Sequence, residues 1–270
     1  MGEGSADNVF VGGLDPWLAR LGNLRNVVRQ ELVSRQLDAH LPQGHLRVLD
    51  VGAGQGTQSL RLAALGHEVT AVEPDERMRE AFAAYAAGLA DPARVTLVAG
   101  QLATLEAVLG DTAYDVVLCH GVLMYLPESA GAMSALARRV APGGLLSVVA
   151  RNGAAMAWRP AVRGDWPGAL AMLDEIEAAR RAGRDAHYVN EIGVSARADS
   201  PQALAAHAES EGLHVLSWYG IRVATDGVHV DTPTPDPEEL ALLLDVEERL
   251  GRTDPYRRLG TLVHVVATRA

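Results

Sequence analysis

The chain has 270 residues and is 48% hydrophobic, which is enough for the core of one large α/β domain. Its formal net charge of −10 comes from 24 basic side chains, all of them arginine, and 34 acidic ones. This balance argues against a protein coated with positive charge for nucleic acid, although it leaves room for a local basic patch. The sequence has no apolar run near the ~18 residues of a membrane-spanning helix, no signal-peptide pattern, and one cysteine, Cys119, which cannot form an internal disulfide. We therefore expect one domain over 1–270, in a reducing cytoplasm and away from membranes.

A helical region opens the predicted fold, because apolar residues recur at roughly helical spacing over 14–41. Apolar runs then alternate with helical patterns. The expected strands are 48–51, 68–74, 94–100, 114–125 and 143–151, and the expected helices are 58–65, 76–90 and 129–142. Such alternation is typical of a doubly wound, mostly parallel sheet, whose strand-to-helix loops share one edge and bind ligands there.

The alternation breaks after Arg151. Residues 151–200 include a charged helix over roughly 169–182, and we interpret them as an inserted cap over the active site. A helix (201–211), a strand (213–224), a helix (238–250) and a last strand (260–270) follow. The two additional strands bring the predicted sheet to seven. The expected fold class is therefore α/β and Rossmann-like, with an inserted cap.

The most informative stretch is Asp50-Val51-Gly52-Ala53-Gly54-Gln55-Gly56, where an apolar strand runs into a glycine turn and a helix start. Glycines let the backbone approach a nucleoside closely, and Glu73, before Pro74 at the end of the next strand, can accept hydrogen bonds from both ribose hydroxyls. The spacing is GxGxG, whereas the dinucleotide fingerprint is GxGxxG with a pyrophosphate at the helix N-terminus. Because Asp50 suits a cationic sulfonium better than a pyrophosphate, the pattern favours S-adenosylmethionine. An NAD-type fold, or a plain turn with a surface acid, is the alternative.

At this point the sequence resembles a known family. The segments RVLDVGAGQG, GHEVTAVEP, LCHGVLMYLP and APGGLLSV are similar to the motif series of class I S-adenosylmethionine-dependent methyltransferases. More specifically, the chain resembles the bacterial tRNA 5-carboxymethoxyuridine methyltransferases, which methylate the carboxylate of a modified wobble uridine. The segments that carry this likeness are GNLR (22–25), Asn152-Gly153, YGIRV (219–223) and DPYRRLGTLVHVVATR (254–269).

The resemblance implies a set of cofactor-binding residues. It assigns Arg25 to the methionine carboxylate and matches Gly52, Ala53, Glu73, Gln101, Leu102 and His120 to the family's cofactor site, while Asp50, Gly54, Gly56 and Pro74 join them from the turn itself. Leu102 departs from the family, in which an acid commonly binds the adenine amino group. The cap departs too, because residues 151–200 hold seven arginines and seven acids where the family has a basic stretch.

The candidate catalytic residues are His120, Tyr125 and Asn152. A carboxylate acceptor with a pKa of about 4 is already ionised at neutral pH and requires no general base. A hydroxyl or amine acceptor would make His120 the first candidate base, although a histidine at a strand end can equally be bonded to backbone. Tyr125 either lines the acceptor pocket or packs the following helix. The remaining histidines show no metal-ligand spacing, so we expect no metal.

The sequence thus leads to a methyltransferase that methylates an oxygen, a carboxylate or a hydroxyl. The family likeness indicates modified tRNA as the acceptor, whereas the acidic charge balance indicates a small molecule, as in natural-product tailoring. A protein that binds S-adenosylmethionine without catalysis, and an NAD-dependent oxidoreductase, are the alternatives from other classes.

Overall fold

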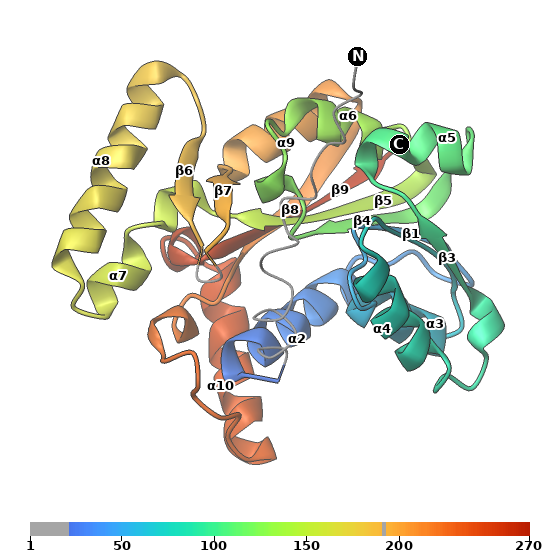
Figure 1. Ribbon diagram of the computed structural model, residues 1–270, viewed down its shortest axis with the longest axis horizontal. Helices are drawn as coiled ribbons and strands as arrows, with labels where there is room; N and C mark the ends of the chain where they lie inside the picture. The colour runs from blue at the N-terminus through green and yellow to red at the C-terminus, as the bar shows by residue number, and fades with distance from the viewer. Residues whose placement is uncertain (1–21, 191–192) are drawn as a thin grey trace.

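The computed structural model describes residues 22–190 and 193–270. A seven-stranded sheet with the order β3-β2-β1-β4-β5-β9-β8 runs through its centre (Figure 1), and β9 is antiparallel to both of its neighbours. The strands are β1 (Arg47–Val51), β2 (Glu68–Glu73), β3 (Val95–Ala99), β4 (Tyr114–His120), β5 (Val140–Arg151), β8 (Leu213–Ile221) and β9 (Leu262–Arg269). The predicted seven-stranded, mostly parallel α/β architecture is confirmed.

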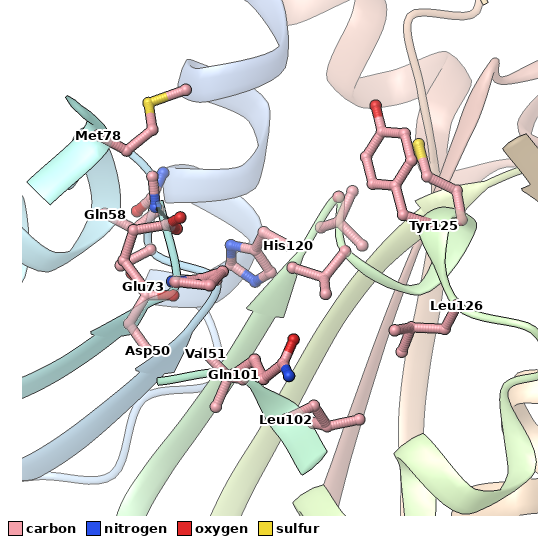
Figure 2. A pocket seen from close by; sticks show the side chains of 18 of the residues that line it. Asp50, Val51, Gln58, Glu73, Met78, Gln101, Leu102, His120, Tyr125 and Leu126 are labelled. Atoms are coloured by element: carbon pink, nitrogen blue, oxygen red, sulfur yellow. Dashed lines mark hydrogen bonds between the residues drawn. The ribbon is translucent and has the colours of Figure 1, made fainter. Parts of the chain in front are cut away.

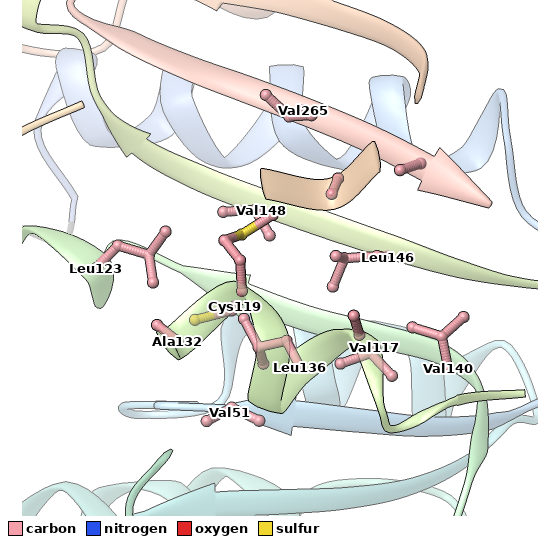
Figure 3. Close-up of a cluster of buried hydrophobic side chains, with 14 of the residues drawn as sticks. Val51, Val117, Cys119, Leu123, Ala132, Leu136, Val140, Leu146, Val148 and Val265 are labelled. Atoms are coloured by element: carbon pink, nitrogen blue, oxygen red, sulfur yellow. The ribbon is translucent and has the colours of Figure 1, made fainter. Parts of the chain in front are cut away.

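Helices cover both faces of the sheet, as the apolar stripes of the sequence require. The face with α2 (Leu24–Asp38), α3 (Thr57–Ala64), α4 (Glu76–Ala86) and α10 (Pro237–Arg252) lies opposite the face with α5 (Leu105–Leu109), α6 (Ala130–Ala137) and α9 (Pro201–Ser210). Figure 3 shows the core on the α6 face, where Cys119 is buried among valine and leucine side chains. Burial raises the pKa of its thiol, so Cys119 is a core residue of β4.

Two of the differences from the predicted element boundaries lie between β4 and β5. The strand expected over 114–125 ends at His120, because Gly121 has a φ of +78° and the chain then forms the 3-10 helix η4 (Leu123–Tyr125). The helix expected over 129–142 ends at Ala137, because Val140 already pairs with Tyr114. The first shift shapes the loop that follows β4 at the carboxyl edge of the sheet, and the second lies at the opposite edge, where β5 begins.

The segment 151–200 forms a small unit beside the main sheet (Figure 1). It contains α7 (Trp158–Val162), α8 (Trp166–Ala182) and an antiparallel pair of strands, β6 (Ala186–Val189) and β7 (Ser195–Ala198), none of which except α8 was predicted. Helix α2 is the described part of the predicted 14–41 region, and residues 14–21 lie outside the described residues. Among the residues that the structure describes, no helix is long and apolar enough to cross a membrane.

Candidate active site

A cavity of about 660 Å³ opens at the carboxyl ends of β1, β2, β3 and β4. Ligands of doubly wound sheets bind at this edge. The predicted residues that line it are Asp50, Gly52, Ala53, Gly54, Glu73, Pro74, Gln101, Leu102, His120 and Tyr125. Figure 2 shows His120 between the acids Asp50 and Glu73 on one side and Tyr125 on the other. The cavity therefore has an acidic end and an end lined by η4.

The glycine turn after β1 forms one wall of the cavity. The N–H groups of Gly52 and Ala53 donate to the carbonyl of Val72 at 2.8 and 3.2 Å, which ties the turn to the end of β2. A Cβ on Gly52 would lie 2.3 Å from Cγ2 of Val122, and its φ is +73°. Only glycine satisfies both constraints, so the turn keeps its backbone open to the cavity.

Gly56 has a different role from the one predicted. It precedes α3 with a φ of +89°, and a Cβ there would lie 2.5 Å from the ring of Phe82. Gly56 does not line the cavity. It lets the buried Phe82 of α4 pack against the start of α3, and so acts on the site through packing.

Glu73 is held in place by the turn that it faces. Its two carboxylate oxygens accept hydrogen bonds from the N–H of Gly54 at 2.8 Å and the N–H of Asp75 at 2.9 Å. Burial raises the pKa of Glu73, and these two bonds act in the opposite direction. A carboxylate has about four lone-pair positions, so capacity remains for two ligand hydroxyls.

Asp50 supplies a second acid at the same end. It is 4% exposed, and its Oδ2 accepts a hydrogen bond from Ser59 Oγ at 2.7 Å. Burial raises its pKa to about 6, against the effect of the Ser59 bond, and Glu73 adds to the rise. Burial therefore disfavours the ionised form of Asp50, and a cation bound nearby would favour it.

His120 and Tyr125 line the other end. His120 Nε2 lies 2.9 Å from Ser147 Oγ, and burial, with Arg29 adding, lowers its pKa to about 3. Tyr125 Oη lies 3.3 Å from Asn190 Nδ2, and burial raises the pKa of its phenol. Both side chains are neutral at pH 7, so one can accept and the other can donate a hydrogen bond there.

Two further predicted site residues lie outside the cavity. Asn152 is 1% exposed, and its amide donates to the carbonyls of Arg258 and Gly260 at 3.1 and 2.8 Å while accepting from the N–H of Ala154. The structure thus places the predicted catalytic residue Asn152 behind the cavity, where its amide joins the end of β5 to the loop before β9. Arg25 is 3% exposed and does not line the cavity either.

Arg29 was missed and lies in the cavity wall instead. It follows Arg25 by one helical turn on α2, so the two guanidinium groups leave the same face of the helix at different heights. The sequence signal for Arg29 was the repeat of arginine at positions i and i+4 of the predicted helix. Which of the two arginines reaches the cavity depends on how α2 packs against the sheet, and the sequence does not show that packing.

The described residues of the 151–200 segment do not line the cavity. They contact its wall from behind, where Tyr188 Oη lies 3.8 Å from Met124 Sδ and Asn190 bonds to Tyr125. The cap is therefore a support for η4 across its described part. Within residues 22–190 and 193–270, no group of three or more His, Cys, Asp or Glu side chains is placed to hold a metal ion.

Comparison with known proteins agrees with this geometry. Residues 49–148 match the family described as a methyltransferase domain. The chain is 27% identical over 251 residues to the tRNA 5-carboxymethoxyuridine methyltransferase of Escherichia coli strain K12, covering 91% of this chain and 90% of the relative. The chain is a class I methyltransferase. Its cofactor is S-adenosylmethionine.

Other proteins resemble the methyltransferase over a shorter stretch of sequence or at lower sequence identity. It is 34% identical over 140 residues to a ubiquinone biosynthesis O-methyltransferase of Methylocella silvestris, which covers 49% of this chain and 52% of the relative. Its fold is similar to that of a possible histamine N-methyltransferase from Thermotoga maritima, with a TM-score of 0.58 at 15% identity over 97% of this chain and 98% of that one. The glycopeptide N-methyltransferase MtfA bound to S-adenosylhomocysteine gives a TM-score of 0.56 at 18% identity, over 95% and 97% of the two chains.

The cavity residues fit this cofactor. Two buried acids, a glycine turn without side chains and a guanidinium together offer partners for the ribose, the sulfonium and the methionine carboxylate of S-adenosylmethionine. A pyrophosphate would instead meet Asp50 and Glu73 at close quarters, with like charges opposed.

Proposed function

We propose that the methyltransferase transfers the methyl group of S-adenosylmethionine to an oxygen, and that its acceptor is a carboxylate, by likeness that of carboxymethoxyuridine in tRNA. Support for this acceptor comes from the Escherichia coli relative, which aligns with about nine-tenths of both chains. In the arrangement that we infer, Glu73 binds the ribose and Gln101 and Leu102 flank the adenine. Arg29 binds the methionine carboxylate, and Asp50 lies toward the sulfonium.

The observation that carries the proposal is the distribution of ionisable groups in the cavity. The acids among its described lining residues are Asp50, Glu73 and Asp75, and all belong to the cofactor end. At the other end lie neutral Tyr125 and the apolar side chains of η4, while neutral His120 lies between them and the acids (Figure 2). An acceptor carboxylate is already ionised at pH 7, so this end requires no base.

Methyl transfer from a sulfonium is an in-line displacement, in which the nucleophile, the methyl carbon and the sulfur must be aligned. Alignment within an enclosed site can lower the barrier by up to about 7–11 kcal/mol without acid–base chemistry. Leu126, Pro127 and Ala135 give this end of the cavity apolar walls. We infer that positioning accounts for catalysis here.

Incorporation of labelled methyl groups tests the proposal. The purified protein is incubated with methyl-labelled S-adenosylmethionine and tRNA that carries carboxymethoxyuridine, and tRNA without the carboxymethoxy group is the matched control. We expect label in the first tRNA alone, and its release as volatile methanol in mild base, because esters hydrolyse under conditions that leave methyl ethers and N-methyl groups intact. Label that resists base would disprove the carboxylate acceptor.

A small-molecule acceptor is the second candidate, and the net charge of −10 favours it. A tRNA enzyme neutralises several phosphates, and each one steepens the fall of affinity with salt. Relatives that are named ubiquinone biosynthesis O-methyltransferases also match half of the chain. Absence of label in either tRNA, with label in a pool of small carboxylic acids and phenols, would support this candidate.

A further inference from the structure

A line of polar side chains crosses the sheet behind the cavity. His120 Nε2 lies 2.9 Å from Ser147 Oγ, Ser147 Oγ lies 2.7 Å from His264 Nε2, and His264 Nδ1 lies 2.8 Å from Gln36 Oε1. Ser147 and His264 have no exposed surface, and Gln36 is 4% exposed. Strands β4, β5 and β9 and helix α2 each supply one member, and of the four only His120 lines the cavity.

With the Gln36 amide turned as the structure has it, Oε1 toward His264, the donors and acceptors along this line have one consistent arrangement. Gln36 Oε1 is an acceptor, so His264 carries its proton on Nδ1 and has a lone pair on Nε2. Ser147 therefore donates its O–H to His264 and accepts the N–H of His120 Nε2. In a neutral imidazole the other nitrogen is an acceptor, so Nδ1 of His120 has the lone pair and is the ring nitrogen left for the cavity.

Both rings are neutral in this arrangement. Burial, with Arg29 adding, lowers the pKa of His120 to about 3, and burial, with His120 adding, lowers the pKa of His264 well below its ordinary value. A protonated His264 would turn a second N–H, that of Nε2, toward the Ser147 hydroxyl and break the order of the line, and a protonated His120 would have no lone pair on Nδ1. The line thus determines the tautomer of His120 at every pH near neutrality.

We propose that Ser147 and His264 are positioning residues, which hold the Nδ1 lone pair of His120 toward the α-ammonium of S-adenosylmethionine. This rests on the cofactor placement proposed above, with Glu73 at the ribose and Arg29 at the methionine carboxylate. Arg29 is close enough to His120 to lower its pKa, so the two lie at the same end of the cofactor. The carboxylate of the cofactor's amino-acid group then meets the Arg29 guanidinium, and its ammonium meets the lone pair on His120 Nδ1. In the other tautomer an N–H of His120 would face the N–H groups of the ammonium, donor against donor.

Calorimetric titration with two probes tests the proposal. S-adenosylhomocysteine carries the amino-acid group, and 5′-methylthioadenosine lacks it. Ser147→Ala removes the acceptor of the His120 N–H, and we expect it to weaken S-adenosylhomocysteine binding about tenfold while methylthioadenosine binding changes by less than about twofold. Ser147→Thr keeps the hydroxyl and is expected to restore affinity. Thr268→Ala is the matched control, because it removes a hydroxyl of β9 that donates to the Gly144 carbonyl at 2.9 Å.

The tautomer itself is read by nitrogen NMR of the ligand-free protein, with the His120 signals assigned by their loss in His120→Gln. We expect a protonated Nε2 and an unprotonated Nδ1 in the wild type, and a mixture in Ser147→Ala. The reverse pattern in the wild type would overturn the proposal, since it would mean that the Gln36 amide is turned the other way. Equal losses for both probes, or none, would also overturn it. Failure of the wild type to bind either probe would instead refute the cofactor placement and, with it, the ammonium contact, while the spectrum still reports on the positioning.

Discussion

At the scale of single residues, Asp50 gives the cavity a charge that depends on pH. Burial raises its pKa to about 6, so the carboxyl group is mostly neutral at pH 5 and mostly ionised at pH 7. The sulfonium of S-adenosylmethionine is a cation, whereas the thioether of S-adenosylhomocysteine is neutral. The two ligands otherwise share their titrating groups, so their ratio isolates Asp50.

We therefore expect the preference for S-adenosylmethionine over S-adenosylhomocysteine to rise between pH 5 and pH 7, by roughly three- to tenfold. The measurement is calorimetry of both ligands across this range. In Asp50→Asn the ratio of the two dissociation constants should be flat with pH. A ratio that rises equally in the variant would remove Asp50 from the sulfonium's surroundings.

Glu73 gives a second prediction at this scale. Glu73→Gln keeps the size of the side chain but loses charge-assisted hydrogen bonds to the ribose, so we expect cofactor affinity to fall about 10- to 100-fold. Glu68→Gln is the matched control, because Glu68 begins the same strand and is exposed. Similar affinities for the two variants would argue against the ribose contact.

At the scale of elements, three glycines bring β8, α10 and the loop before β9 together. A Cβ on Gly220 would lie 2.2 Å from the carbonyl oxygen of Arg257. A Cβ on Gly260 would lie 2.6 Å from Cα of Gly220, and a Cβ on Gly251 would lie 2.3 Å from the carbonyl oxygen of Gly220. The C-terminal segments that resemble the tRNA methyltransferase family contain Gly220 and Gly260. In this chain both glycines are required for packing.

Gly220→Ala should lower the free energy of unfolding by about 2 kcal/mol or more, because the new methyl group meets backbone that cannot move aside. Gly22→Ala, at an exposed position where a Cβ meets nothing within 4 Å, serves as the control and should change it by less than about 0.5 kcal/mol. Urea denaturation measures both. Equal free energies of unfolding for the two variants would mean that the backbone around Gly220 moves aside at no cost in stability.

Arg197 links the small sheet to η4. It is 2% exposed, pairs with buried Asp199 at 2.5 Å, and donates to the carbonyls of Leu123 and Leu126 at 2.9 and 3.2 Å. Arg197→Met leaves the buried Asp199 carboxylate with the Ser129 hydroxyl but without a cation, so we expect the free energy of unfolding to fall by about 3–5 kcal/mol. The exposed Arg184–Glu175 pair is the control, and Arg184→Met should alter stability by at most about 1 kcal/mol. A small effect of Arg197→Met in urea denaturation would show that η4 keeps its own shape.

At the scale of the whole molecule, the central sheet could be predicted because its apolar strands alternate with helices in simple order. The glycine turn and Glu73 were equally readable, since a local pattern determines their place at the sheet edge. Asn152 was not, because its partners lie more than 100 residues away, at Arg258 and Gly260. The place of Arg29 could not be predicted either, because it depends on how α2 is tilted and positioned over the sheet, and tertiary packing determines both. The apolar residues after Gly121 resembled strand but follow a left-handed glycine.

The support of η4 by β6 and β7 has a consequence for how this enzyme can change. The acids of the cofactor half lie in or just after β1 and β2, whereas Leu123, Met124 and Tyr125 of η4 are hydrogen-bonded to Arg197, Tyr188 and Asn190 respectively. Different elements of the chain thus form the two halves of the cavity. We therefore expect substitutions in β6 and β7 to change the η4 end of the cavity more than the cofactor end, so a combinatorial library for new acceptor selectivity belongs in these two strands.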